Sequence, residues 1–270
     1  DPIALGREDE GFADAQRVFF ADETQGKIFR IDRDGENLTE LYSSTATQFW
    51  LFVDSDSRVL YFMEKDSGVG AIYRVGFDGT NLINLQSDIS FPTSFTVDLT
   101  IGKLYWVSDQ SDSPGFFINR SDLDGANPVN FFTEVSSFDD VNEMRADSTN
   151  GFLYWTQVGA NNVIRRAPLG NSVAVQSIAT PNGQELAVGL TLDIEAGALY
   201  WSEPIMGKIF SASLDGNNPL EIFAGDRSSP QFIEIDPSNT DQLYFSNTDE
   251  RQVERLVLST GTRTVLASTS

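Results

Sequence analysis

The sequence predicts an all-β fold, a six-bladed β-propeller with four antiparallel strands per blade, because one aromatic pair recurs six times at intervals of 42 to 49 residues. The pairs are Phe19-Phe20, Tyr61-Phe62, Tyr105-Trp106, Tyr154-Trp155, Tyr200-Trp201 and Tyr244-Phe245. A period of roughly 45 residues is the length of one four-stranded blade. The six copies extend over the whole sequence, so residues 1–270 are expected to form a single domain.

An aspartate precedes five of the aromatic pairs by seven or eight positions, after a short run of alternating apolar residues. These residues are Asp54, Asp98, Asp147, Asp193 and Asp236. Alternation with a period of two predicts the inner strand of each blade, ending at a turn, and the Asp side chains are expected to accept hydrogen bonds either in that turn or between blades. The first blade departs from this spacing, because Asp14 lies only five residues before Phe19. Either residues 2–5 supply its inner strand, or they add to the last blade.

A third short run follows each aromatic pair and leads into a turn that contains glycine. The turns are Asp34-Gly35, Asp78-Gly79, Asp124-Gly125 and Asp215-Gly216, with Leu169-Gly170 and Thr260-Gly261 as weaker versions. Asp-Gly between two alternating runs predicts a hairpin, because glycine adopts the positive φ that such turns require. The fourth strand of each blade is expected after this turn.

Together these residues resemble the YWTD propellers, the class B repeats of the low-density-lipoprotein receptor. The best-matching copy reads Leu192-Asp193, Leu199-Tyr200-Trp201-Ser202-Glu203, Gly207-Lys208-Ile209 and Leu214-Asp215-Gly216. The Thr-Asp half of the motif is replaced by Ala21-Asp22, Met63-Glu64, Val107-Ser108, Thr156-Gln157, Ser202-Glu203 and Ser246-Asn247. The resemblance implies a six-bladed propeller, and a stand-alone secreted member, such as a fungal one, is compatible with it.

The composition excludes several classes of function. The chain has 40 Asp and Glu against 18 Lys and Arg, a formal net charge of -22, which repels nucleic acids and anionic membranes. It has no cysteine and no histidine, which excludes disulfides, Ser-His-Asp hydrolysis, cysteine nucleophiles and imidazole metal sites. We therefore expect a protein that is not an enzyme; the alternative is a lactonase-like or lyase-like enzyme that uses a divalent cation such as calcium.

The resemblance implies that a ligand meets the face where inner strands begin and second strands end. The segments expected there supply aromatic rings for stacking and polar groups for hydrogen bonds. The candidate ligand-binding residues are Phe49, Trp50, Phe91, Asn142, Glu143, Glu203, Phe232 and Asn247. Trp50 is the leading candidate because it lies outside the repeated aromatic pair, whereas Trp106, Trp155 and Trp201 occupy it and are expected to pack between blades.

The leading functional hypothesis is a binding protein that holds a small organic molecule, such as an aromatic pigment or metabolite, at the mouth of the propeller channel. A bound chromophore would make it a chromoprotein. The alternative is a lectin or a protein-binding module that uses the same face for a glycan or a protein partner.

Two features favour secretion. The sequence opens at Asp1-Pro2 without methionine, as expected after removal of a signal peptide. Two glycosylation sequons begin at Asn37 and Asn119, and the first follows an Asp-Gly turn, so Asn37 is the predicted glycosylation site.

Overall fold

The computed structural model describes residues 3–5, 17–32, 36–109, 115–134, 140–159, 162–170, 174–179, 186–225, 228–236 and 239–268. These residues form six four-stranded antiparallel sheets, and the strands of each sheet are paired in sequence order. The predicted fold class is therefore confirmed: the protein is an all-β, six-bladed propeller. The chain divides into two compact units, residues 1–133 and 134–270, each with three sheets.

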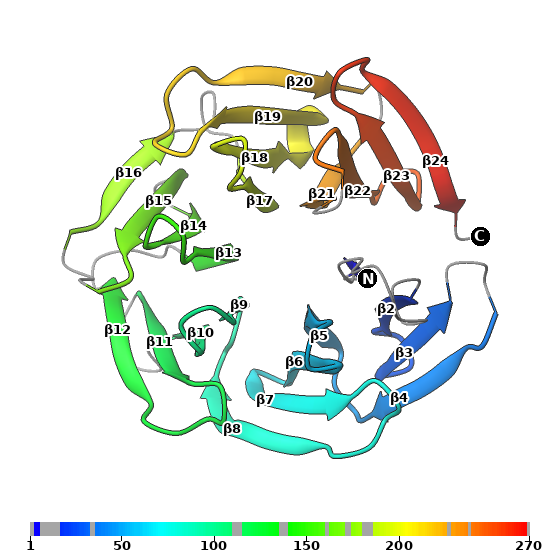
Figure 1. The fold of residues 1–270 in the computed structure, drawn as a ribbon, viewed down its shortest axis with the longest axis vertical. Helices are drawn as coiled ribbons and strands as arrows, with labels where there is room; N and C mark the ends of the chain where they lie inside the picture. The colour runs from blue at the N-terminus through cyan, green and yellow to red at the C-terminus, as the bar shows by residue number, and fades with distance from the viewer. Residues whose placement is uncertain are drawn as a thin grey trace. The chain divides into compact units, whose positions relative to one another are not determined.

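The first unit contains blades one to three (Figure 1). Blade one has strands β1 (Ile3–Leu5), β2 (Arg17–Asp22), β3 (Lys27–Asp32) and β4 (Thr39–Ser43). Blade two has β5 (Gln48–Asp54), β6 (Val59–Asp66), β7 (Val69–Gly76) and β8 (Ile83–Ser90). Blade three has β9 (Phe95–Asp98), β10 (Lys103–Asp109), β11 (Phe116–Asp122) and β12 (Val129–Glu134).

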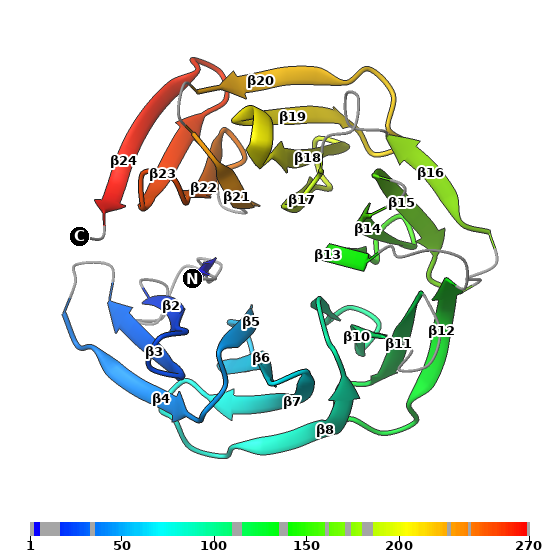
Figure 2. The same cartoon turned by 180° about the vertical axis from the view of Figure 1, so that it is seen from behind.

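The second unit contains blades four to six. Blade four has β13 (Asp140–Asp147), β14 (Phe152–Val158), β15 (Val163–Pro168) and β16 (Gln176–Ala179). Blade five has β17 (Leu190–Asp193), β18 (Ala198–Glu203), the short 3₁₀ helix η1 (Pro204–Met206), β19 (Lys208–Ser213) and β20 (Leu220–Ala224). Blade six has β21 (Pro230–Ile235), β22 (Gln242–Asn247), β23 (Gln252–Val257) and β24 (Thr262–Ser268). Figure 2, the view from behind, shows η1 on the near side of blade five.

The first inner strand comes from the N-terminal residues. Ile3–Leu5 pairs antiparallel with β2, with Ile3 opposite Phe20 and Leu5 opposite Val18. Of the two alternatives left open by the sequence, residues 2–5 thus supply the inner strand of blade one. Asp14 and the turn Asp34-Gly35 lie outside the described residues.

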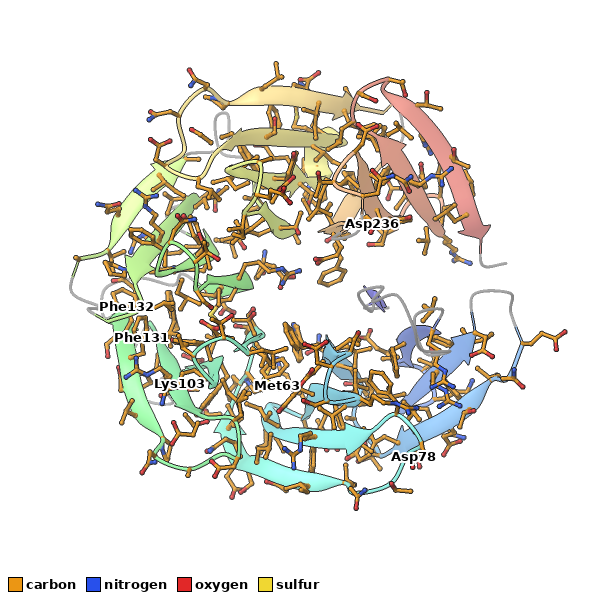
Figure 3. All side chains as sticks on the ribbon, in the orientation of Figure 1. Met63, Asp78, Lys103, Phe131, Phe132 and Asp236 are labelled. Atoms are coloured by element: carbon orange, nitrogen blue, oxygen red, sulfur yellow. The ribbon has the colours of Figure 1, made fainter. Side chains whose placement is uncertain are left out.

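The repeated aspartates close the turns between first and second strands, as predicted. Asp54 Oδ1 accepts the N–H of Ser57 at 3.0 Å, and Asp193 Oδ1 accepts that of Ala196 at 2.8 Å. Asp98 and Asp147 accept backbone N–H groups of their own turns in the same way. Asp236, labelled in Figure 3, accepts a bond from the hydroxyl of Tyr244 at 3.4 Å. The side chain replaces the next backbone partner at the point where the strand stops.

The Asp-Gly hairpins have a second role that the sequence did not show, because they pack onto the preceding blade. The φ angles of Gly79, Gly125 and Gly216 are +79°, +83° and +81°. A Cβ on Gly125 would lie 2.2 Å from the carbonyl oxygen of Leu85 in β8, and a Cβ on Gly216 would lie 1.7 Å from that of Ile178. Figure 3 shows Asp78, beside Gly79, next to β4 of blade one. At Gly125 and Gly216 glycine is therefore required both by the turn and by the contact between blades, whereas at Gly79 only the turn requires it.

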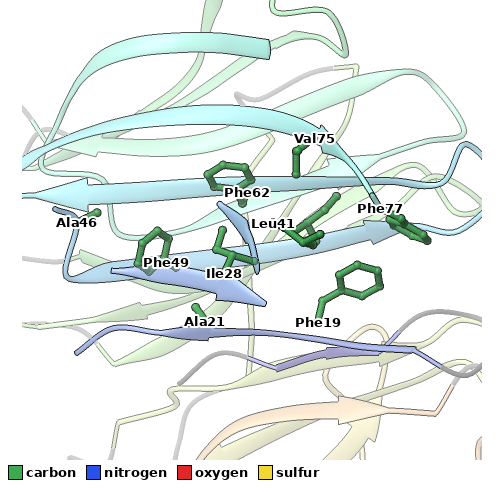
Figure 4. Packing of buried hydrophobic residues seen from close by; sticks show 10 residues of the cluster. Phe19, Ala21, Ile28, Leu41, Ala46, Phe49, Phe62, Val75 and Phe77 are labelled. Carbon is green, nitrogen blue, oxygen red and sulfur yellow. The ribbon is translucent and has the colours of Figure 1, made fainter. Parts of the chain in front are cut away.

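The apolar cores lie between neighbouring blades of each unit. One cluster joins blades one and two through Phe19, Ile28, Phe49, Phe62 and Phe77, as Figure 4 shows. The rings of Phe19 and Phe77, from the two blades, are 4.5 Å apart between centroids. Further clusters join blades two and three, four and five, and five and six. Burial of such rings supplies most of the favourable free energy of folding.

Arginines of the third strands add hydrogen bonds between blades. Arg30 Nη1 donates to the carbonyl of Phe77 at 2.6 Å, and Arg166 Nη1 donates to that of Leu214 at 2.9 Å. Both carbonyls directly precede the Asp-Gly turn of the next blade. The Ile-x-Arg and Asp-Gly parts of the repeat therefore meet across a blade boundary.

We expect two glycines of blade three, Gly102 and Gly125, to differ in their tolerance of a methyl group. Gly102 has a φ of +68° but nothing within 4 Å of an added Cβ, whereas Gly125 has a φ of +83° and the Leu85 carbonyl at 2.2 Å. Gly102→Ala is expected to lower the free energy of unfolding by about 1 kcal/mol, the cost of the left-handed conformation. Gly125→Ala is expected to lower it by about 3 kcal/mol, because a clash is added. Urea unfolding of both variants measures the difference, and equal losses would contradict the proposed packing.

Candidate functional site

The three aromatic candidates of the first unit differ in their exposure to solvent. Phe49 is buried in the core between blades one and two, where Figure 4 shows it beside Ile28, so it offers no stacking surface to a ligand. Trp50 is half-buried and packs against the core between blades two and three. Phe91 alone of the three is exposed, at 51%.

In the second unit, two candidates lie at irregularities of the inner strands. Asn142 is at the β-bulge between Val141 and Glu143 and is half-buried. Phe232 is at the shift in register between Pro230 and Ile233 and is exposed. A bulge redirects a side chain away from the regular alternation of the strand, which explains why the ring of Phe232 faces solvent.

The side chains at the ends of second strands are held by hydrogen bonds within their own blades or to the neighbouring blade. Glu203 is buried and accepts the indole N–H of Trp201 at 2.9 Å. Asn247 is buried too; its Nδ2 donates to Glu254 Oε1 at 2.8 Å, and its Oδ1 accepts the N–H of Ser229 at 3.0 Å. In the first unit, Glu64 at the same position accepts bonds from Tyr42 and Ser44 of blade one. These groups support the blades and are already engaged without a ligand.

The residue directly before this position, which corresponds to the Thr of the YWTD motif, differs between the two units. In blades four and five it is a hydroxyl residue that bonds to two blades. Thr156 Oγ1 accepts the N–H of Glu143 at 3.0 Å and donates to the carbonyl of Val188 at 3.2 Å. Ser202 Oγ likewise accepts the N–H of Gly189 at 2.9 Å and donates to the carbonyl of Gln231 at 2.7 Å.

The same position in the first unit is apolar and fully buried. It is occupied by Ala21, Met63 and Val107, and Figure 3 labels Met63 on β6. The substitutions that interrupt the YWTD motif thus replace hydrogen bonds by apolar packing. The hydroxyl of the motif is therefore a structural link between blades.

A charged cluster on the inner strands of the second unit was missed by the sequence reasoning. Arg145 of β13 donates through Nη1 to Glu143 and through Nη2 to Glu234 Oε2 of β21, the latter at 2.8 Å. Thr191 of β17 donates to the other oxygen of Glu234 at 3.4 Å. Arg145 thus connects blades four and six across blade five. We call Glu143, Arg145, Thr191 and Glu234 the Arg145 cluster.

The repeat contains a signal that identifies this cluster. The residue two positions before the repeated aspartate is Phe52, Thr96, Arg145, Thr191 or Glu234. Each of these pairs with the tyrosine of the repeated aromatic pair, so all five share one register position. Opposite charges at the same position of nearby blades predict an ion pair along the inner strands.

Burial and the nearby charge of Glu234 raise the pKa of Glu143, whereas Arg145 acts to lower it. The two carboxylates raise the pKa of Arg145, whose guanidinium stays charged throughout the pH range of protein stability. Arg145 is consequently the group that allows two carboxylates to share this partly buried position.

Some of the exposed apolar side chains lie at the hairpins between second and third strands and beside them; others lie at or just before the fourth strands, namely Leu38, Leu82, Val129 and Leu220. Ile205 and Met206 of η1 are 71% and 48% exposed, and Val69, which follows the hairpin of blade two, is 55% exposed. Large apolar side chains that face solvent at equivalent places in different blades are candidates for contact with a partner. Sequence reasoning missed Val69, Ile205 and Met206 because it searched these segments for aromatic and polar residues.

Metal-binding clusters and membrane-spanning helices are two further features that bear on function. Among the residues that the structure describes, no group of three or more Asp or Glu side chains is placed to hold a metal ion. No helix in the described ranges has the length and apolar character needed to cross a membrane.

Comparisons with known proteins agree with the fold. The chain of a nidogen/laminin complex superposes with a TM-score of 0.74 at 18% identity, covering 92% of this chain and 91% of that chain. Virginiamycin B lyase from Staphylococcus aureus gives a TM-score of 0.71 at 19% identity, over 96% and 83%. The likeness is one of fold. This chain is a six-bladed propeller.

At the level of sequence the relationships are distant. No protein-family model matches the chain. It is 26% identical to the protein cueball of Drosophila yakuba over 146 residues, which cover 50% of this chain and 22% of that protein. The match therefore spans about a fifth of the curated relative.

We expect removal of the Arg145 guanidinium to destabilise the protein in a pH-dependent way. Arg145→Met leaves Glu143 and Glu234 without their shared cation, and because the cluster is partly exposed we expect a loss of about 2 kcal/mol at pH 7. The loss should shrink near pH 4, because protonated carboxyl groups need no cation. Urea unfolding at both pH values tests this.

The control is Lys208→Met, which removes an exposed ion pair with Glu221 and should change stability little at either pH. A loss for Arg145→Met that is equal at the two pH values would mean that lost packing, and not the charge cluster, explains it.

Proposed function

We propose that this protein is a non-enzymatic binding module whose partner is another protein. The observation that supports it best is the exposure of Val69 and Phe91 in the first unit and of Ile205, Met206 and Phe232 in the second. These residues lie at hairpins between second and third strands, before an inner strand or, for Phe232, near the start of one. We call Val69 with Phe91, and Ile205 with Met206, the two patches. Desolvation of such side chains by a partner is the main source of affinity in protein interfaces.

Several observations favour binding over catalysis. The chain has no histidine, and Glu203, Asn247 and Glu64 are held by hydrogen bonds within or between blades. A variant of the similar virginiamycin B lyase in which a histidine is replaced by alanine is catalytically inactive. A propeller without histidine lacks the group on which that lyase depends.

The comparisons also favour a protein over a small molecule. The similar propeller of highest TM-score given above comes from a complex of nidogen with laminin. For the small aromatic ligand expected from the sequence, Phe49 is unsuitable because it is buried in the core, and Trp50 is half-buried against another core. A protein surface requires no deep cavity, so the exposed side chains suffice.

Affinity capture tests the proposed function. The intact chain is used as bait in extracts and culture medium of the source organism, with chemical cross-linking and mass spectrometry. We expect a protein that cross-links near one of the two patches and is lost with Phe91→Asn or with the double variant Ile205→Ser, Met206→Ser. The matched control is Leu220→Ser, an exposed apolar residue on the outer strand β20, which should leave capture unchanged.

Two outcomes would overturn this proposal. A specific signal on a glycan array, without capture of a protein, would favour the lectin. Visible or near-ultraviolet absorption of the purified protein beyond that of its aromatic residues, with a bound mass in native mass spectrometry, would favour a chromophore.

We also propose that the protein is secreted and that Asn37 carries an N-linked glycan. Asn37 is exposed, has a φ of +55° and is followed by Leu38 and Thr39. Asn37 Nδ2 donates to Asp32 at 2.6 Å on the exposed surface. By contrast, Asn119 is half-buried within β11, and the hydroxyl residue of its sequon, Ser121, is fully buried. A glycan at Asn119 would have to displace packed side chains.

Expression in a eukaryotic secretory host tests the glycan. After enzymatic removal of N-glycans in heavy-oxygen water, peptide mass mapping should show the conversion of Asn37 to labelled aspartate and no change at Asn119. Asn127, which occupies the same turn in blade three with a φ of +52° but has Val129 two residues later, is the internal control. Modification at Asn119, or an unmodified Asn37 in secreted protein, would contradict the assignment.

A further inference from the structure

Most described residues with a left-handed backbone conformation occupy a turn position that recurs in other blades, and the exceptions lie together at one corner of the propeller. Nine described residues other than glycine have positive φ: Asn37, Arg58, Ser67, Asn81, Asp88, Phe91, Asn127, Asn218 and Arg251. The four asparagines share one position after the Asp-Gly turn. Arg58 and Arg251 occupy turn positions at which other blades have glycine, such as Gly102 and Gly207. Only Ser67, Asp88 and Phe91 remain, and they lie close together.

These three residues surround the hairpin between β6 and β7. Asp66 pairs with Val69 across the hairpin, and Val69 pairs with Ser90 at the end of β8. The N–H of Phe91 donates to the carbonyl of Gly68 at 2.6 Å. Residues 66–69 and 88–91 thus form one contiguous surface, which we call the Phe91 corner.

The ring of Phe91 is held in place from below. A Cβ on Gly68 would lie 2.6 Å from the ring, so the ring covers the glycine directly. A Cβ on Gly70 would lie 2.4 Å from Pro92, which fixes the next residue as well. Phe91 nevertheless has a φ of +40°, a costly conformation for a bulky residue, and 51% of it faces solvent. Such strain persists only where the surroundings enforce it, and it is concentrated at binding sites.

The chemistry of the corner defines what it can bind. Phe91 and Val69 supply exposed apolar surface on neighbouring segments, and Asp66 and Asp88 of the same two segments are exposed. Within the described part of the chain, neither carboxylate forms an ion pair; Asp66 accepts bonds from Thr45 and Ser67, and Asp88 accepts one from Ser87. Exposed carboxylates pair with cations, and an exposed aromatic face attracts them as well.

Building on the protein-binding function proposed above, we infer that the Phe91 corner docks a protein segment in which an arginine or lysine lies next to an apolar side chain. The apolar side chain covers Val69 and Phe91, and the cation pairs with Asp66 or Asp88. The net charge of -22 attracts such a basic segment over a longer range. Phe91, held rigid before binding, loses little conformational freedom in the complex.

A random-peptide library displayed on phage, selected on the intact chain at low salt, provides the probe. We expect the selected peptides to be enriched in arginine or lysine beside leucine, methionine or an aromatic residue. The strongest peptide is then synthesised, and its affinity is measured by fluorescence anisotropy. Phe91→Asn, chosen because asparagine tolerates positive φ, should weaken binding by about tenfold or more.

The electrostatic contribution is tested with Asp66→Asn and Asp88→Asn. Together they should weaken binding severalfold at about 0.05 M salt and have little effect at about 0.5 M, where exposed charges are screened. Leu220→Ser, at an exposed apolar residue of the outer strand β20, is the matched control and should leave affinity unchanged. Urea unfolding of Phe91→Asn should show a stability equal to or above that of the wild type, which separates a loss of contact from a loss of fold.

The outcomes separate this inference from the function on which it depends. Peptides that bind Phe91→Asn as tightly as the wild type, or that lose affinity with Leu220→Ser instead, would overturn the docking site while leaving a protein-binding module. Failure of the library to yield any binder would also overturn it, and the capture experiment would then decide separately whether the chain binds a folded protein.

Discussion

The structure depends first on the close approach of the hairpins at Gly125 and Gly216 to the last strand of the preceding blade. Gly125 lies so close to the carbonyl of Leu85 that no side chain fits between them. The same boundary carries the hydrogen bond from a third-strand arginine, as Arg166 donates to Leu214, and the aromatic cores lie beneath it. A four-stranded sheet exposes an apolar face on both sides and cannot be stable alone, so the fold exists only because consecutive blades fit together at this distance.

The two units reach this fit by different chemistry. Thr156 and Ser202 connect neighbouring blades through hydroxyl groups that accept one backbone bond and donate another, whereas Met63 and Val107 fill the same position with apolar volume. In both arrangements this buried position is satisfied, because the hydroxyl groups of Thr156 and Ser202 are paired and the apolar side chains need no partner. A blade can therefore lose the hydroxyl of the motif and keep its geometry, because the apolar side chain that replaces it packs in the same place and needs no hydrogen bond.

The proposed binding surface follows from departures from the repeat. Residues that recur, such as the asparagines with positive φ after each Asp-Gly turn, are explained by the turn itself. Phe91 and Ile205 have no such explanation, since the fold does not need an exposed ring above Gly68 or an exposed isoleucine on η1. The inner strands, by contrast, carry the Arg145 cluster, whose charges are satisfied among themselves. The residues that hold the blades together and the residues proposed to bind a partner thus lie in different parts of the blades.

The sequence by itself determined the number of blades, the order of strands and the turns closed by residues such as Asp54 and Asp193, because these depend on local periodicity and local hydrogen bonds. Only the tertiary structure decided which aromatic residues are available to a partner: Phe49 and Phe91 both begin a blade, yet one is buried and the other exposed. The reason is that exposure depends on what the adjacent blade places against a side chain. The partners of Arg145 were decided in the same way, because Glu234 follows 89 residues later and only the stacking of blades brings it within 2.8 Å.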